Sequence, residues 1–338
     1  MSVLLLPANT PQSFYRGGSR ISRFRGVSAG PDPYRPEDWI ASTTSRFQAA
    51  PAGLTVLPDG KLLADAIASA PDWWLGALHV ARFGITPAIL VKLLDAGQRL
   101  PLHVHPDRPF AAGHLASPYG KTEAWVIVSA EPDAVVHLGF SRDVSPAELA
   151  DWVAGQNVAD MLAATNHVPV RAGDAVLCPA GVPHAIGAGI LLVEVQEPTD
   201  FSVLLEWDGF LIDGPTAGHL GLGFDVALQC VDRSGWGEHA VAALRQARPD
   251  ARPGIERLFP MAADEFFAAE RLRPDPAVAL EPAYSVVVVT AGTGTLENEH
   301  GEPVAVGAGH TLLIPYAAGH CELRGMVEAI RLKPPMEQ

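Results

Sequence analysis

One spacing occurs twice in this chain and constrains its fold more than any other feature. A glycine is followed after five residues by a proline, and after four more residues by a histidine. The two copies are Gly173-x5-Pro179-x4-His184 and Gly309-x5-Pro315-x4-His320. In both copies an apolar pair lies between the glycine and the proline, where a short strand would run. A repeated unit of strand and tight turn predicts two similar β-barrels in one chain.

A second motif lies upstream of the first copy. His103 and His105 flank a single residue, and side chains two apart on a strand point to the same face. Two imidazoles from one strand can therefore converge inside a barrel with groups from neighbouring strands. Glu123 and His184 complete a set of three imidazoles and one carboxylate, which suits a first-row transition metal. The second copy has no such pair, so we expect metal in the first barrel only.

The chain is long enough for two domains, with 338 residues. Short apolar runs bounded by glycine and proline predict a mainly β protein. We place an N-terminal unit at residues 1–233 and a C-terminal unit at residues 234–338. The predicted strands are 88–95, 123–128, 134–140, 168–170, 175–178, 190–196, 201–205 and 284–290. Glycines at 292 and 294 predict a turn after the last of these.

A small helical insert is predicted near residues 145–165. Ser145-Pro-Ala-Glu148 has the pattern of a capping box, with serine at the N-cap and proline at the first helical position. Gly155 can end this helix. Further helices are predicted at 61–70, 158–164 and 264–272.

Charge and hydropathy exclude several classes of protein. The net charge of −14 argues against a general nucleic-acid surface. No window approaches the ~18 apolar residues that a membrane helix needs, and the N-terminal apolar run is too short for a signal peptide. We therefore expect a cytoplasmic protein. The three cysteines are far apart and form no CxxC pair, so neither a disulfide framework nor a zinc ribbon is indicated.

The segments Gly97-x5-His-x-His and Gly173-x5-Pro-x-Gly-x2-His resemble the paired signatures of the cupin (jelly-roll) barrel. More narrowly, the chain resembles the class I mannose-6-phosphate isomerases of the short bacterial type, which are zinc-dependent bicupin enzymes. The blocks that carry this resemblance are 90–95, 103–107, 119–125, 179–187 and 192–200. It covers residues 88–200 well and the C-terminal barrel more loosely.

The resemblance implies a site and a reaction. His103, His105, Glu123 and His184 would bind one Zn²⁺, although the same set also suits Mn²⁺, Fe²⁺ or Co²⁺. The implied activity is the interconversion of mannose 6-phosphate and fructose 6-phosphate, which belongs to carbohydrate metabolism.

Proton transfer in this reaction needs a base near the metal. The lysine of the Gly-Lys-Thr-Glu block, Lys121, would line the substrate pocket. Glu194, Asp200 and Lys121 are the candidates for the base, of which we assign catalytic roles to Lys121 and Glu194.

Two positions depart from that family. His103 stands where glutamine is usual, and Leu204 stands where an arginine follows ten residues after Glu194. Leucine cannot replace the bidentate contacts of a guanidinium. Candidate substitutes are Arg82, Arg99, Arg108 and Arg142. Two alternatives therefore stay open: an isomerase or epimerase of another sugar, phosphorylated or not, and a non-catalytic sugar-binding bicupin.

Overall fold

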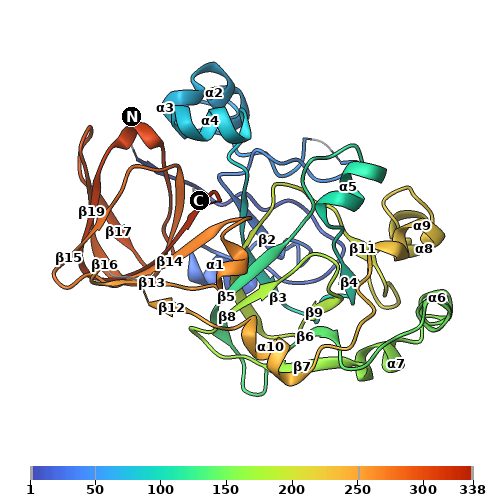
Figure 1. Cartoon of the computed structure of the whole chain (residues 1–338). Coiled ribbons are helices and arrows are strands. Elements are labelled where there is room, and N and C mark those ends of the chain that lie inside the picture. The colour runs from blue at the N-terminus through green and yellow to red at the C-terminus, as the bar shows by residue number, and fades with distance from the viewer. Residues whose placement is uncertain (1–2, 50, 250–251, 336–338) are drawn as a thin grey trace.

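The protein is a two-part, mainly β molecule in the computed structural model, which describes residues 3–49, 51–249 and 252–335. Figure 1 shows the two β units side by side. The N-terminal unit has two five-stranded antiparallel sheets. The first contains β2 (Glu37–Ile40), β3 (Leu90–Ala96), β10 (Ile190–Gln196), β5 (Glu123–Ala130) and β8 (Ala175–Cys178), in that order. The second contains β11 (Val203–Leu204), β4 (His103–Val104), β9 (His184–Ile186), β6 (Val135–Phe140) and β7 (Thr165–Pro169).

The central strands β3 and β10 are buried along their whole lengths. Side chains alternate between the two faces of a strand. Leu93 and Val193 therefore point away from the pocket, into an apolar core that also holds residues of β16 and β19 from the other barrel. Lys92 and Glu194 face the opposite way and line the pocket of the first barrel. The shared core fixes this sheet, and with it the polar groups that the sheet carries inward.

The C-terminal unit is built on one nine-stranded sheet. Its strands are β1 (Leu4–Leu5), β12 (Arg248–Pro249), β13 (Ile255–Arg257), β14 (Ala268–Leu272), β15 (Ala277–Leu280), β16 (Ser285–Asn298), β17 (Val304–Gly307), β18 (Thr311–Ile314) and β19 (Cys321–Lys333). The first strand of the chain pairs with β18, so residues near the N-terminus complete the sheet of the second unit. The division at 233/234 stays a prediction.

The helices are short. They are α1 (Ser19–Phe24), α2 (Leu63–Ser69), α3 (Pro71–Leu75), α4 (Ala77–Phe83), α5 (Arg108–His114), α6 (Pro146–Gly155), α7 (Val158–Ala163), α8 (Gly214–Ala217), α9 (Phe224–Ala227) and α10 (Glu238–Ala243). The predicted helices at 61–70, 145–155 and 158–164 are confirmed as α2, α6 and α7. Ser145 caps α6 by accepting a hydrogen bond from the amide of Glu148 at 3.1 Å. Among the described residues, no helix is both long and apolar enough to cross a bilayer.

Two predictions in the C-terminal unit are wrong. Residues 264–272 are not a helix, because β14 occupies the end of this segment after a 3-10 turn at Met261–Ala263. Its composition favours a helix, but pairing with β19 overrides that preference. Gly292 and Gly294 do not form a turn, because β16 continues through them to Asn298. A side chain on Gly292 would overlap the carbonyl oxygen of Met326, which explains the glycine there.

The two barrels share a register but differ in chemistry. Glu123 lies opposite Cys178, and Ser285 lies opposite Ile314 at the matching place of the repeat. The ladder pair Glu194–Lys92 of the first barrel is matched by the pair Arg331–Glu270 of the second. The second barrel thus holds a hydroxyl where the first holds a carboxylate, and an ion pair of reversed polarity.

This reversed pair gives a prediction about stability. Glu270 is buried and accepts hydrogen bonds from Arg252 at 2.6 Å and Lys333 at 2.8 Å, with Arg331 at 3.7 Å. Glu270→Gln keeps the shape but leaves buried cations with less compensation, so we expect a loss of about 3 kcal/mol in the free energy of unfolding. Urea unfolding measures it. The exposed Glu297, which pairs with Arg324, is the control: Glu297→Gln should cost less than about 1 kcal/mol. Equal small losses in both variants would contradict this account.

Candidate metal centre and pocket

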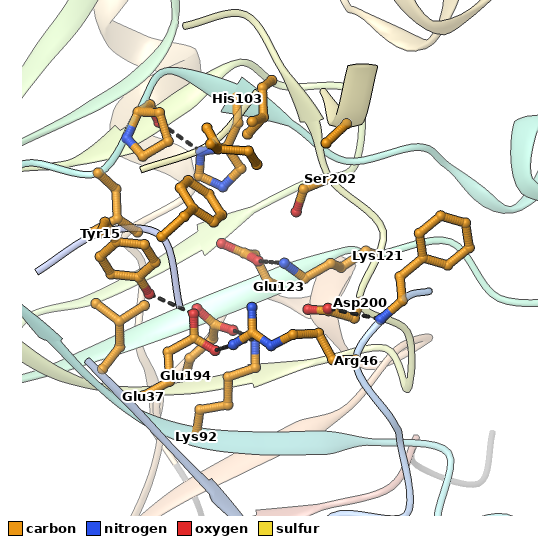
Figure 2. Close-up of a pocket in the computed structure, with 18 of the residues that line it drawn as sticks. Tyr15, Glu37, Arg46, Lys92, His103, Lys121, Glu123, Glu194, Asp200 and Ser202 are labelled. Atoms are coloured by element: carbon orange, nitrogen blue, oxygen red, sulfur yellow. Dashed lines mark hydrogen bonds and ion pairs between the residues drawn. The ribbon is translucent and has the colours of Figure 1, made fainter. Parts of the chain in front are cut away.

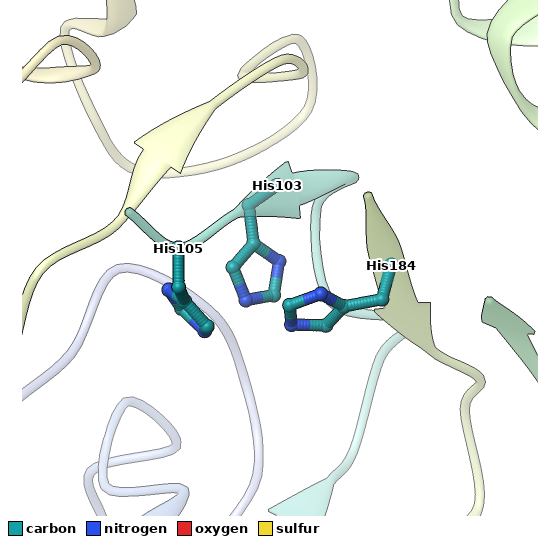
Figure 3. A group of neighbouring side chains, drawn as sticks. All are labelled: His103, His105 and His184. Carbon is teal, nitrogen blue, oxygen red and sulfur yellow. The ribbon is translucent and has the colours of Figure 1, made fainter. Parts of the chain in front are cut away.

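Three imidazoles meet where β4 and β9 run side by side. His103 lies opposite His184 in the antiparallel ladder, and His105 follows directly after β4. The three ring centroids are 4.2 to 4.9 Å apart, and Figure 3 shows the rings facing a common space. All three residues are buried. The two imidazoles thus converge as their spacing predicted, although the strand itself ends one residue before His105.

Backbone carbonyl groups orient each of the three rings. In every ring Nδ1 lies 2.7 to 2.8 Å from a carbonyl oxygen, and these oxygens belong to Pro101, Phe201 and Val182. A carbonyl oxygen only accepts, so Nδ1 carries the proton and Nε2 carries the lone pair. Such a bond on the far nitrogen is the usual support of a metal-binding histidine. The three Nε2 atoms are thus prepared to act as ligands.

Glu123 brings the carboxylate to the same place. It begins β5, and its Oε2 lies 2.9 Å from Nε2 of His105, while its Oε1 lies 3.3 Å from Nε2 of His184. The indole of Trp125 donates to Oε1 at 2.9 Å. Because Nε2 and the carboxylate oxygens are all acceptors, close approach needs a positive charge among them. Lys121 supplies one, with Nζ 2.8 Å from Nε2 of His105 and 3.2 Å from Oε2 of Glu123.

The electrostatics favour the ligand form of His105, His103 and Glu123. Burial and the charge of Lys121 lower the pKa of His105 to about 3, and burial beside the other two rings lowers the pKa of His103 well below its ordinary value. Burial would raise the pKa of Glu123, but the charge of Lys121 together with the contacts of His105 and His184 outweighs it and holds that pKa well below the usual range. Neutral imidazoles and an ionised carboxylate are the protonation states that bind metal.

The remaining polar atoms fit a cation as well. Oε2 of Glu123 and Nε2 of His184 are buried and have no hydrogen-bond partner of suitable geometry among the described residues. Cys178 lies in the same cluster, with its sulfur within 4.8 Å of ligand atoms of Glu123 and His184. Three imidazole nitrogens and a carboxylate oxygen match the ligands of a divalent first-row metal. The structure thus brings the four predicted ligands to one point.

A cavity of about 260 Å³ opens from this cluster. Its wall includes Leu204, at the position where the sequence lacks an arginine. Besides Glu123, the charged side chains among its described lining residues are Glu37, Arg46, Lys92, Lys121, Glu194 and Asp200. Figure 2 shows them around one space below His103. The candidates Lys121, Glu194 and Asp200 therefore all face the cavity.

The four arginines suggested as substitutes lie elsewhere. Arg99 pairs with Glu206, Arg108 with Glu197, and Arg142 with Glu148, each at 2.6 Å. Arg82 lines a different cavity beside α4. None of the four lines the cavity at the metal cluster.

Sequence reasoning missed Glu37, Arg46 and Lys92. A signal for Lys92 does exist, because it is a charged residue within a buried, mainly apolar strand, as Glu194 is in β10. Such a charge needs a partner, and the two form an ion pair at 3.1 Å. Arg46 lies in an irregular segment after β2, where no periodic pattern marks it.

The pKa values of two buried carboxylates in the pocket are shifted in opposite directions. Burial would raise the pKa of Glu37, but Lys92 and Arg46 lower it to about 2. The hydroxyl of Tyr15 and the indole of Trp39 also donate to this carboxylate, each at 2.6 Å. Glu37 is therefore a permanent anion.

Glu194 differs from Glu37 although Lys92 contacts both. Burial raises the pKa of Glu194, and although the charge of Lys92 lowers it, the nearby charge of Glu123 raises it further. Catalytic bases commonly have a raised pKa, and Glu194 has such a pKa beside the candidate metal centre.

No protein-family model matches the chain. It is 32% identical to mannose-6-phosphate isomerase of Streptococcus mutans over 188 residues, which is 54% of each protein. It is 36% identical to mannose-6-phosphate isomerase ManA of Bacillus subtilis over 112 residues, which is 33% of this chain and 34% of that protein. The chain thus spans about half the length of the first curated relative and a third of the second.

Solved structures match over nearly the whole chain. Mannose 6-phosphate isomerase from Bacillus subtilis has a TM-score of 0.76 at 21% identity, covering 98% of this chain and 99% of that one. A mannose 6-phosphate isomerase bound with zinc and yttrium has a TM-score of 0.76 at 15% identity, covering 99% and 100%. These likenesses confirm the predicted mainly β fold of two cupin barrels with a helical insert. The curated relatives confirm the resemblance over part of the chain. The solved structures match the fold over nearly all of it.

Proposed function

We propose that this protein is a metal-dependent aldose–ketose isomerase that interconverts mannose 6-phosphate and fructose 6-phosphate. The observation that carries the proposal is the convergence of three imidazole Nε2 atoms and one carboxylate at the floor of a cavity that also holds Glu194 and Lys121. The similarity to curated mannose-6-phosphate isomerases supports the choice of substrate. A cytoplasmic location stays a prediction.

His103, His105, Glu123 and His184 would hold one metal ion. We propose Zn²⁺, supported by the donor set and by a structure of the same fold that was solved with zinc. When bound, such an ion supplies a Lewis acid that polarises the carbonyl group of the sugar. His103, which replaces the usual glutamine, adds an imidazole that binds zinc better than an amide oxygen does.

The reaction moves two protons. The proton on C2 of the aldose moves to C1, and the hydroxyl proton on O2 moves to O1. The product of the two transfers is the ketose. We assign the carbon proton to Glu194, because its buried carboxylate faces the cavity and has a raised pKa. Lys121 would stabilise negative charge on the sugar oxygens as it does on Glu123.

Asp200 is less suited to proton transfer. One of its carboxylate oxygens accepts a hydrogen bond from the backbone amide of Phe47 at 3.1 Å. This bond anchors the segment after β2 against the segment after β10. This contact supports a positioning role for Asp200 and the choice of Glu194 as the base.

The test follows the carbon-bound proton. Metal-loaded protein in deuterated water should convert mannose 6-phosphate to fructose 6-phosphate and exchange the C2 proton, as read by proton NMR. Protein stripped with a chelator should do neither and should recover when zinc is restored. Free mannose should turn over far more slowly. Absence of both conversion and exchange would rule out an isomerase of this substrate, and equal turnover of free mannose would rule out a role for the phosphate.

A further inference from the structure

The cationic side chains of the pocket differ in how many of their N–H donors already contact other groups of the protein. Lys121 contacts His105 and Glu123, and Lys92 lies between Glu194 at 3.1 Å and Glu37 at 3.7 Å. Both lysines are buried. Each of them therefore already neutralises carboxylates of the site.

Arg46 is different. The one hydrogen bond of its side chain to a described residue joins Nη2 to Oε2 of Glu37 at a long 3.4 Å. Its Nε is buried and has no partner within the described part of the chain. A buried donor without a partner costs free energy unless a ligand or water satisfies it. The guanidinium, which carries five N–H donors, therefore has donors available in the pocket.

A contact with an aromatic ring also holds this guanidinium in place, and that contact uses no N–H donor. It lies 5.4 Å from the ring centroid of Trp39, a cation–π contact. Figure 2 shows the side chain reaching across the pocket toward Glu37 and Glu194. Glu37 has shorter hydrogen bonds from Tyr15 and Trp39, so this carboxylate is satisfied without Arg46. A fixed, planar and under-used guanidinium is prepared for an anionic ligand.

Its place in the cavity indicates which part of a ligand it would meet. Arg46 lines the cavity at the metal cluster and also a second, more open cavity next to it. Its side chain keeps 17% of its surface exposed, against 4% for Lys92. Arg46 thus lies at the solvent side of the pocket, where a doubly charged group loses less of its hydration than at the buried floor.

We propose that Arg46 binds the phosphate group of the substrate and so sets the preference for a phosphorylated sugar. The inference rests on the proposed function. It explains how the chain tolerates Leu204, which lines the same cavity and has no donor to offer. The guanidinium comes from the segment after β2 instead of from β11, and its fork can give a phosphate two parallel hydrogen bonds.

The experiment compares Arg46→Leu, Arg46→Lys and a control. Arg46→Leu should raise KM for mannose 6-phosphate by about tenfold or more, leave kcat within about twofold, and leave turnover of free mannose unchanged. Arg46→Lys keeps the positive charge but loses the two parallel N–H donors of the guanidinium. Its KM should therefore fall between those of the wild type and Arg46→Leu. Arg142→Gln removes the same charge from a surface pair with Glu148 and should change neither KM nor kcat. Thermal unfolding of every variant checks that it is folded.

A second measurement does not depend on turnover. Inorganic phosphate, titrated calorimetrically into the protein, should bind the wild type and Arg142→Gln, and should bind Arg46→Leu about tenfold more weakly. Unchanged phosphate affinity in a folded Arg46→Leu variant overturns the proposal, and so does an equal loss of activity on mannose 6-phosphate and free mannose. If the wild type does not isomerise mannose 6-phosphate, the proposed function fails, while the phosphate titration still decides the role of Arg46.

Discussion

Glu123→Ala and His105→Ala are expected to prevent binding of the proposed metal ion and to abolish the proposed isomerase activity. Each change removes one of four converging donors, and His105 and Glu123 also contact each other at 2.9 Å. Loss of a group that only supports a ligand already costs about 10- to 100-fold in affinity, so loss of a ligand should cost at least about a hundredfold. Elemental analysis after dialysis against a weak chelator measures the metal directly.

The matched control for these variants lies in the second barrel. His320 occupies the same place in the repeat as His184 but is exposed, whereas His184 is buried. His320→Ala should keep one metal ion per chain and full activity. Stoichiometric metal in the Glu123 and His105 variants would mean that the ion binds elsewhere. Loss of metal in the His320 variant would show that the second barrel takes part.

Glu194→Gln should lower kcat by about a thousandfold while KM and metal content stay close to those of the wild type. General-base catalysis contributes about 10²- to 10⁴-fold, and the amide keeps the size of the side chain without its basicity. Lys92 keeps its contact with Glu37 at 3.7 Å, which limits the cost to the fold. The direct readout is the rate at which the C2 proton exchanges with solvent, and it should fall in parallel with kcat.

The two other candidates for the base serve as comparisons. Asp200→Asn should lower kcat by a much smaller factor, because a carboxylate oxygen of Asp200 already accepts a hydrogen bond from the amide of Phe47. Lys121→Gln should also lower kcat, but it should retain metal, since Lys121 is not one of the four side chains that would hold the ion. If Asp200→Asn abolishes exchange while Glu194→Gln retains it, the assignment of the base is wrong.

Local spacing was enough to predict several elements. Ser145 and Glu148 predicted the start of α6, because a capping box satisfies amides within a single turn. His103 and His105 predicted two converging ligands, because the alternation of a strand is a property of the backbone. The wrong helix at 264–272 shows the limit of such reasoning, since pairing with β19 decided that segment.

The sequence by itself determined the four candidate metal ligands and the two-barrel plan, because both follow from residue type and short-range spacing. Only the tertiary structure decided which charges meet in the pocket. Lys92 and Glu194 lie far apart in the chain and meet because β3 and β10 are neighbours. Arg46 reaches the same cavity from an irregular segment after β2. Contacts between distant segments depend on how sheets pack, and no local pattern encodes that packing.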